Sequence, residues 1–286
     1  MKMPDNKIQS VIQYFHLKLD SLYIDREVDS FFWILLESEL GYTRLDYMKN
    51  PDLRLTESQM LTFISFTRRL AKFEPVQYIA GETDFMGNIF KVSPSVLIPR
   101  PETEELVNWV TSTFSKTANL KIIDIGTGSG CIAITLKSKF PNANVLGIDI
   151  MENALEMAAQ NSVLNNADVH FEKRDALHLE NQQNQYDVVV SNPPYVLNSE
   201  KKEMRENVMN YEPHTALFVA DTEPLLFYNA IAKWAIDSLK EKGYLFFEIN
   251  ENFAEETKAS LLKIGFTTCQ IRNDIFDKPR MIMAQK

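Results

Sequence analysis

Apolar residues recur at helical spacing through the first part of the chain. One side of a predicted helix carries Val28, Phe31, Phe32, Leu35 and Leu36. A second helix is predicted to begin at Thr56, because a Thr followed three residues later by Gln59 is the pattern of a capping box. Aromatic residues such as Trp33 are expected in the helical core. We therefore predict a small helical domain over residues 1–74.

The pattern changes between residues 75 and 101. Short β-type runs such as Asn88–Val92 stand among glycines and prolines, which favours turns. This segment is predicted to be a linker that contains a β-hairpin.

Beyond this segment, β-type runs alternate with helical ones. Helices are predicted at Glu152–Leu164 and Pro224–Leu239. The predicted strands are Lys121–Ile125, Asn144–Ile150, Val169–Lys173, Asp187–Ser191, Tyr244–Ile249, Thr267–Arg272 and Met281–Ala284. Strict alternation indicates a mostly parallel α/β sheet over residues 102–286. The last two strands are joined by the short segment Asn273–Arg280, so they can only be antiparallel neighbours or a hairpin.

Composition places the chain among ordinary globular proteins. It has 286 residues, 45% hydrophobic and 24% charged, which suggests two domains. The two cysteines have no CxxC spacing, and the four histidines have no metal-ligand spacing, so no metal site is expected. No secretory signal or membrane-length apolar run is found, and we expect a cytoplasmic monomer without membrane contact. The net charge of −9 argues against nucleic-acid binding.

A glycine-rich loop follows the predicted strand Lys121–Ile125 and precedes a helix. It contains Gly126, Thr127, Gly128, Ser129 and Gly130. Glycines let the backbone turn sharply and let a ligand approach main-chain N–H groups. The GxGxG spacing favours S-adenosylmethionine over a dinucleotide, whose fingerprint is GxGxxG. A glycine turn that binds nothing is the alternative.

Acidic residues stand at the ends of the neighbouring strands. Asp149 is positioned to accept hydrogen bonds from the hydroxyls of a ribose. Asp124, just before the loop, suits the cationic end of the same cofactor. Asp175 could contact an adenine amino group, although a solvated aspartate is almost as good an interpretation.

The segment Asn192–Tyr195, which reads Asn-Pro-Pro-Tyr, follows a buried strand at the sheet edge where open α/β proteins place their chemistry. Two prolines make it rigid. The side-chain oxygen of Asn192 and the carbonyl of Pro193 could accept the N–H bonds of a planar amide or exocyclic amine. Tyr195 could stack on that group. A simple strand-exit turn is the alternative.

Several segments together resemble one family, the protein-(glutamine-N5) methyltransferases that modify the Gly-Gly-Gln loop of bacterial peptide chain release factors. The matching segments are Pro75–Gly81, Phe85–Gly87, Leu97–Glu104, Asp124–Gly130, Asn192–Tyr195, Tyr211–Pro213 and Asp274–Arg280. Asn-Pro-Pro-Tyr alone is shared with adenine and guanine N-methyltransferases. The Ile98–Glu104 segment, which reads IPRPETE, is more specific.

The resemblance implies a class I S-adenosylmethionine-dependent methyltransferase, Rossmann-like with a late antiparallel strand. It also implies an N-terminal helical domain that helps to dock the release factor. Gly126–Gly130, Asp149 and Asn192 would bind the cofactor, and Asn192, Pro193, Pro194 and Tyr195 would hold the glutamine.

Two positions depart from the family pattern. Ala176 stands where many relatives place an aromatic residue against the adenine, and the usual Glu-x-Gly reads Glu248-Ile249-Asn250. The motifs upstream leave more open: Arg100 and Glu102 could form a surface ion pair or face the cofactor, and Glu212 could cap a loop.

The leading hypothesis is therefore methyl transfer to the glutamine N5 of release factors. The nearest alternative is N6-adenine or N2-guanine methylation of nucleic acid, which usually requires a basic surface. A dinucleotide-binding or non-catalytic protein on the same fold is less favoured, because neither gives a reason for Asn192–Tyr195.

Overall fold

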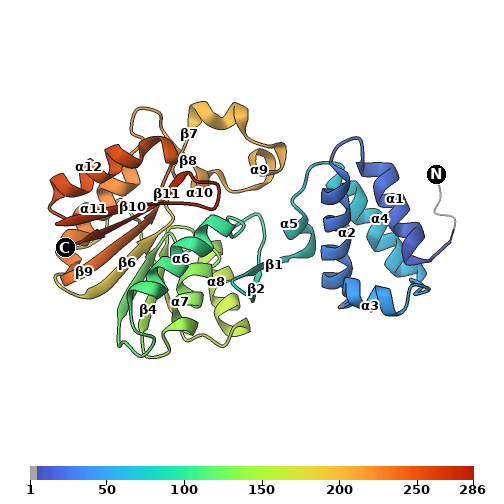
Figure 1. The fold of residues 1–286 in the computed structure, drawn as a ribbon, viewed down its shortest axis with the longest axis horizontal. Helices are drawn as coiled ribbons and strands as arrows, with labels where there is room; N and C mark the ends of the chain where they lie inside the picture. The colour runs from blue at the N-terminus through green and yellow to red at the C-terminus, as the bar shows by residue number, and fades with distance from the viewer. Residues whose placement is uncertain (1–4) are drawn as a thin grey trace. The chain divides into compact units, whose positions relative to one another are not determined.

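A computed structural model describes residues 5–286, which form two compact units. The helical unit comprises the described residues up to Glu82 together with Arg205–Tyr211. The sheet unit comprises Thr83–Met204 and Glu212–Lys286. Figure 1 shows the ribbon of both units and labels most of their helices and strands. Over the described residues, no helix is long and apolar enough to cross a membrane.

The helical unit packs its helices around a cluster of aromatic rings. The helices are α1 (Ile8–Leu19), α2 (Asp25–Leu40), α3 (Arg44–Lys49), α4 (Glu57–Leu70), α5 (Val76–Ala80) and α9 (Glu206–Tyr211). Phe32 of α2 lies 5.4 Å from Phe15 and 5.7 Å from Phe63 between ring centroids. The predicted capping box is confirmed, because Thr56 and Gln59 bond each other's backbone N–H groups. On the predicted apolar side of α2, Phe31 is only partly buried.

The sheet unit is built on a seven-stranded sheet in the order β10-β11-β9-β6-β3-β4-β5. Its strands are β3 (Lys121–Ile125), β4 (Asn144–Asp149), β5 (His170–Lys173), β6 (Tyr186–Ser191), β9 (Leu239–Glu248), β10 (Thr268–Asn273) and β11 (Pro279–Gln285). β11 pairs antiparallel with both β9 and β10, whereas the other pairs in this sheet are parallel, which confirms the predicted late antiparallel strand.

Two further pairs of short strands lie outside this sheet. They are the pair β1 (Glu82–Phe85) and β2 (Asn88–Lys91) and the parallel pair β7 (Val196–Leu197) and β8 (Phe218–Val219). The remaining helices are α6 (Pro101–Thr113), α7 (Cys131–Lys139), α8 (Glu152–Leu164), α10 (His214–Leu217), α11 (Leu226–Ser238) and α12 (Ala254–Ile264), with short 3-10 helices η1 (Asn198–Glu203) and η2 (Glu251–Phe253).

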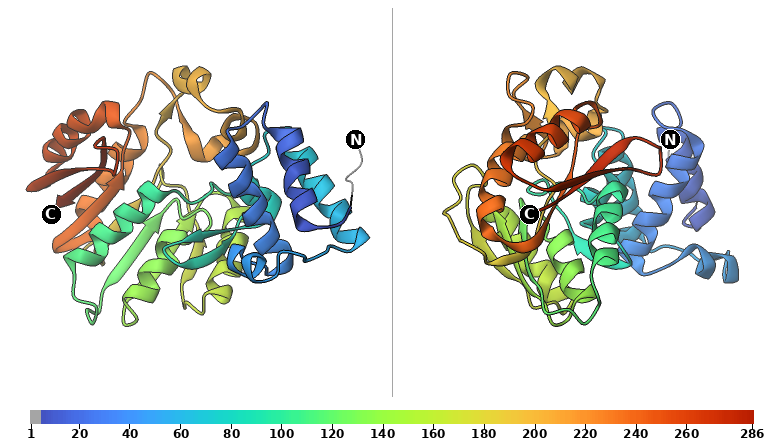
Figure 2. Two further views of the ribbon diagram at one scale, coloured as in Figure 1. Left: turned by 45° about the vertical axis from the view of Figure 1, so that its right-hand side comes forward. Right: turned by 60° about the vertical axis from the view of Figure 1, so that its left-hand side comes forward.

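Alternate residues of each central strand face opposite layers of helices. In β3, Ile122 belongs to the core formed with α6 and α7, whereas Ile123 belongs to the core formed with α11 and α12. Figures 1 and 2 show the green helices and the orange-red helices on opposite faces of the sheet. The sheet is therefore covered on both faces, as the alternating pattern predicted.

One detail of the predicted alternation is wrong. Residues 174–185, between β5 and β6, form turns and coil without a helix. The chain crosses here from the sheet edge at β5 to β6, on the other side of β3. This crossing makes a switch point beside β3, where open α/β sheets form a crevice at the carboxyl ends of their strands.

Candidate active site

A pocket of about 410 Å³ lies at the carboxyl ends of β3, β4 and β6. Its wall brings together ten of the predicted site residues: Gly126, Thr127, Gly128, Ser129, Asp149, Asp175, Ala176, Asn192, Pro193 and Pro194. Gly130 and Tyr195 lie outside the wall. The volume falls in the range of about 300–1,000 Å³ that is usual for small-molecule sites.

The glycine loop is shaped by its own backbone. Gly126, Gly128 and Gly130 have φ angles of 76°, 55° and 81°, which side chains rarely adopt. A Cβ added at Gly126 or Gly128 would meet no atom within 4 Å, so both positions border open space. A Cβ at Gly130 would lie 2.9 Å from Ile134 Cδ1 and 3.1 Å from Ala158 Cβ. Gly130 therefore serves the packing of α7 against α8 rather than the pocket surface.

Two aspartates hold the glycine loop in different ways. The backbone N–H of Gly128 donates to Asp149 Oδ2 at 2.9 Å, and that of Met151 donates to Asp149 Oδ1 at 2.9 Å. Asp149 therefore stands at the pocket with lone pairs left to accept further bonds. Burial raises its pKa. Asp124, by contrast, is fully buried and lies outside the pocket wall.

The buried carboxylate of Asp124 therefore contacts the glycine loop rather than a ligand. Its Oδ2 accepts the hydroxyl of Thr127 at 2.6 Å. Burial raises the pKa of Asp124 to about 7, against the lowering effect of this bond. The expectation that Asp124 faces the cationic end of a cofactor is wrong, because its carboxylate has no access to the pocket.

Asp175 and Ala176 line the pocket beyond β5. Asp175 Oδ1 accepts the N–H of Leu177 at 2.9 Å, and its Oδ2 lies 2.7 Å from His178 Nδ1. The bond to His178 is the main reason that the pKa of Asp175 lies below its usual value. Asp175 is therefore a charged residue whose carboxylate already closes a turn.

The Asn192–Tyr195 segment is fastened to distant parts of the chain. Ser191, the last residue of β6, donates its hydroxyl to the carbonyl of Ile125 at 2.6 Å. Asn192 then donates from Nδ2 to the hydroxyl oxygen of Thr103, in α6, at 3.2 Å. Because Nδ2 points at Thr103, the Oδ1 atom of the same amide is left as an acceptor beside the pocket.

A buried carboxylate organises this contact. Glu248, the last residue of β9, is 1% exposed. Its Oε2 accepts the hydroxyl of Thr103 at 2.6 Å, and its Oε1 accepts the hydroxyl of Tyr195 at 2.9 Å. Glu248 therefore joins both ends of the Asn192–Tyr195 segment.

The charge of Glu248 sets the direction of these bonds. An ionised carboxylate can only accept, so the single hydroxyl proton of Thr103 must point at Glu248. The Thr103 oxygen is then left to accept, and Asn192 must present its NH₂ group to it. Burial raises the pKa of Glu248, whereas Thr103, Tyr195 and the nearby Arg280 favour its charged form.

The side chain of Arg100 has a partner that the sequence did not suggest. It donates to Glu212 Oε1 at 2.5 Å, and Glu212 is 3% exposed. The N–H of Ile98 also reaches Glu212 Oε2 at 3.4 Å. The interpretation of a surface pair between Arg100 and Glu102 is therefore wrong, because Arg100, at the pocket wall, pairs with the buried carboxylate of Glu212.

The sequence missed three residues of the site: Thr103, Glu248 and Glu212. Thr103 and Glu212 stand inside segments that carry the family resemblance, and Glu248 begins the altered Glu-x-Gly motif. These segments were the available signal. Only the fold shows that Thr103 and Glu248 bond each other and hold Asn192 and Tyr195 between them.

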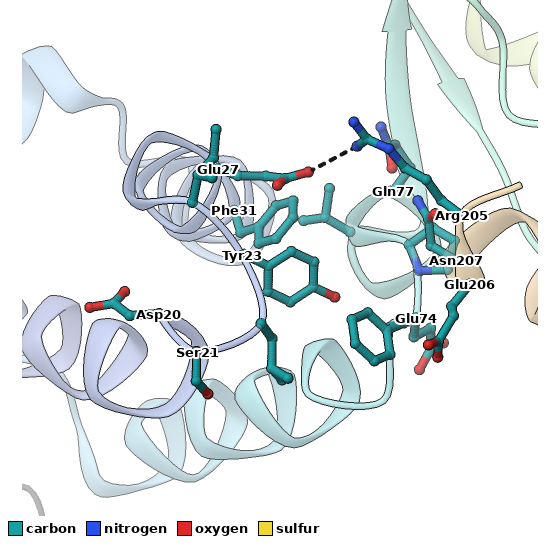
Figure 3. Close-up of a pocket in the computed structure, with 15 residues that line it drawn as sticks. Asp20, Ser21, Tyr23, Glu27, Phe31, Glu74, Gln77, Arg205, Glu206 and Asn207 are labelled. Carbon is teal, nitrogen blue, oxygen red and sulfur yellow. Dashed lines mark ion pairs between the residues drawn. The ribbon is translucent and has the colours of Figure 1, made fainter. Parts of the chain in front are cut away.

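A second pocket, of about 680 Å³, lies within the helical unit. Figure 3 shows the rings of Tyr23 and Phe31 on one side and Glu206 on the other, with Glu27 paired to Arg205 at 3.6 Å. It has no glycine loop. Among the described residues, one group combines metal-ligand atoms within 4.8 Å of one another, namely His16, Asp20 and Asp25. His16 and the two carboxylates are not deeply buried, and we assign them no metal.

Comparison with known proteins defines the class and then the family. Residues 116–261 match the family model of a methyltransferase domain, and residues 10–81 match that of the PrmC N-terminal domain. A solved methyltransferase from Pyrococcus furiosus has the same fold, with a TM-score of 0.50, 16% identity and coverage of 81% of this chain and 99% of that one.

Closer relatives are found among curated proteins. The release factor glutamine methyltransferase of Flavobacterium psychrophilum is 46% identical over 267 residues, 92% of this chain and 94% of that protein. That of Bacteroides thetaiotaomicron is 38% identical over 277 residues, 96% of this chain and 99% of that protein. The chain belongs to the release factor glutamine methyltransferase family.

Proposed function

We propose that this chain transfers a methyl group from S-adenosylmethionine to the side-chain amide nitrogen (N5) of the glutamine in the Gly-Gly-Gln loop of peptide chain release factors. Membership of the family supports this proposal. The observation that carries it is the bond from Asn192 Nδ2 to Thr103, which leaves Asn192 Oδ1 as an acceptor at the pocket.

The pocket residues fit S-adenosylmethionine. Gly126 and Gly128 border open space, so a ligand can approach their backbone closely. Asp149 would accept the ribose hydroxyls, and Asp175 and Ala176 would border the adenine. When bound, this cofactor supplies an electrophilic methyl group on a sulfonium.

The acceptor residues suit an amide nitrogen. An amide is a poor nucleophile, because its lone pair is delocalised into the carbonyl. Asn192 Oδ1 and the Pro193 carbonyl would each accept one N–H bond of the glutamine, fix the nitrogen in position and stabilise the positive charge that develops on it. The described pocket wall contains no histidine, and none is needed because the proton can leave after transfer.

Tyr195 would support the acceptor site without contacting the glutamine. Its hydroxyl is bonded to Glu248, and its ring packs against the core that contains α11. We assign Tyr195 and Glu248 the role of holding the Asn192–Tyr195 segment, which differs from the stacking expected of Tyr195 at the outset.

We assign a separate role to each of three segments of the chain. Residues 1–74 would dock the release factor, residues 75–101 would connect, and residues 102–286 would carry out the transfer. The match of residues 10–81 to the PrmC N-terminal domain supports the first assignment.

The net charge of −9 supports action without direct nucleic-acid binding. We propose that the chain acts as a monomer.

The test is incubation of the purified protein with radiolabelled S-adenosylmethionine and three separate acceptors: release factor, bulk tRNA and duplex DNA. Label is expected on the release factor, and it is expected to vanish when the Gly-Gly-Gln glutamine is replaced. Label on tRNA or DNA alone would show that the acceptor is a base instead.

A further inference from the structure

The turn between β10 and β11 exposes two neighbouring apolar side chains. Ile275 is 70% exposed and Phe276 is 67% exposed. Single exposed apolar residues are common, but two adjacent ones leave apolar surface in water that this chain does not bury, and phenylalanine is enriched in the cores of protein interfaces.

This turn is firmly held. Asp274, which is 6% exposed, accepts at Oδ1 the N–H of Phe276 at 2.9 Å and of Lys278 at 3.1 Å. Its Oδ2 accepts Arg280 Nε at 3.1 Å. The N–H of Ile275 donates to Glu105 Oε1, in α6, at 3.1 Å. The apolar pair is thus presented on a fixed backbone, which lowers the entropy lost when a partner binds.

The sheet register places this turn beside the acceptor site. Met281 of β11 pairs with Glu248, the residue that holds Asn192–Tyr195, and the N–H of Ile249 donates to the carbonyl of Arg280. The turn therefore lies at the sheet edge where β6 ends. With neighbouring strands about 4.8 Å apart, β11 is roughly 10 Å from β6.

A protein substrate is large enough to contact both the pocket and the β10–β11 turn. A protein interface commonly buries about 800 Å² on each partner, which is a patch roughly 30 Å across. A folded protein that places one glutamine in the pocket therefore comes within reach of the β10–β11 turn. A small acceptor that fills only the pocket does not.

We propose that Ile275 and Phe276 form a docking contact for the release factor, against an apolar patch of the substrate protein next to its Gly-Gly-Gln loop. This inference rests on the proposed function. The contact sets affinity for the substrate protein and takes no part in methyl transfer itself.

The test compares two double variants on the same release factor. Ile275→Ser with Phe276→Ser is expected to raise the KM for the release factor tenfold or more. Its kcat is expected to stay within about twofold of the unaltered protein, and its stabilisation by S-adenosylhomocysteine is expected to be unchanged. Ile275→Val with Phe276→Leu keeps an apolar surface and is expected to retain KM within about threefold.

The matched control removes another exposed apolar pair. Val163 and Leu164, 79% and 45% exposed, end α8. Because α8 runs antiparallel to the parallel strands that it connects, its last residues lie at the opposite sheet edge. Val163→Ser with Leu164→Ser is expected to leave KM unchanged.

The outcomes separate the two proposals. An unchanged KM in the Ile275→Ser, Phe276→Ser variant, or an equal rise in the control variant, would overturn the docking contact while the proposed function stands. Failure of the unaltered protein to methylate the release factor would overturn the proposed function and the docking contact with it.

Discussion

The two sides of the pocket are built in different ways. The Gly126–Gly130 loop takes its shape from three glycines with positive φ and from bonds to the end of the next strand, β4, where Ile148 and Asp149 accept its N–H groups. The two prolines make the Asn192–Tyr195 segment rigid by itself, but its orientation depends on Thr103 and Glu248, which come from α6 and from the end of β9.

The two sides of the pocket have different requirements. A cofactor that is common to many enzymes can be held by a local backbone shape. An acceptor nitrogen has to be met by an oxygen with a defined orientation, and that orientation is set by a chain of bonds that only the folded sheet unit assembles. Variants on the two sides should therefore fail in different ways.

The largest effect is expected on the acceptor side, from Asn192→Ala. Loss of one transition-state acceptor should lower kcat by about 100–1,000-fold. Stabilisation by S-adenosylhomocysteine should largely persist, because the glycine loop and Asp149 are intact. Steady-state kinetics and thermal melting measure the two effects. Near-normal turnover would sink the mechanism.

Glu248→Gln should come next. A glutamine can donate to Thr103, so the hydroxyl of Thr103 is free to donate to Asn192 Oδ1 and the amide can turn over. The loss of charge-assisted bonds worth about 1.5–3 kcal/mol corresponds to a fall in kcat of about 10–100-fold. Thr103→Ser, which keeps the hydroxyl, is the control, and a loss there as large as in Glu248→Gln would argue against the bond chain.

The dependence of activity on pH gives a further test of the role of Glu248. Burial raises the pKa of Glu248, and the ionised form is the one that orients Asn192. Activity should therefore be full above that raised pKa and fall as pH drops through it. In Glu248→Gln, the profile should lose this acidic limb and keep a low plateau, which a merely structural defect would not produce.

The cofactor side should respond in binding rather than in turnover. Asp149→Asn removes a charged acceptor and should weaken S-adenosylhomocysteine binding about tenfold, measured by calorimetry. Asp175→Asn is the control with a smaller expected change, because the Asp175 side chain is 34% exposed and its charge is already paired with His178 in contact with solvent. Equal losses in the two variants would remove the distinction between them.

The smallest effect separates packing from binding within the loop itself. Gly130→Ala places a Cβ against Ile134 and Ala158 and should lower the free energy of unfolding by about 1–3 kcal/mol. Gly128→Ala meets no neighbour and should cost only about 1 kcal/mol of backbone strain, with its main effect on cofactor binding. Denaturant unfolding distinguishes them, and the reverse order would contradict the packing role of Gly130.

Much of the fold was predictable, because its signals are local. The strand Lys121–Ile125 and the helix Glu152–Leu164 have the predicted bounds, and the Thr56 capping box is present. The helix-free stretch between β5 and β6 was not predicted, because strict alternation was extended across residues whose turn-forming pattern is weak.

For the candidate site, the sequence predicted the residues that line the pocket but not the residues that hold them in place. The pocket collects the glycine loop, Asp149 and Asn192, each of which belongs to a short motif. The placement of Asp124 and the partner of Arg100 depend on burial and on residues more than a hundred positions away, such as Glu212. Spacing along the chain contains no information on such contacts.

The most direct measurement is fragmentation mass spectrometry of a release factor after reaction with the unaltered protein and with Asn192→Ala. The proposed mechanism predicts one methyl group on the side-chain nitrogen of the Gly-Gly-Gln glutamine with the unaltered protein, and none with an Asn192→Ala variant that still binds S-adenosylhomocysteine. A methyl group on another residue or atom, or equal methylation by the variant, would contradict it.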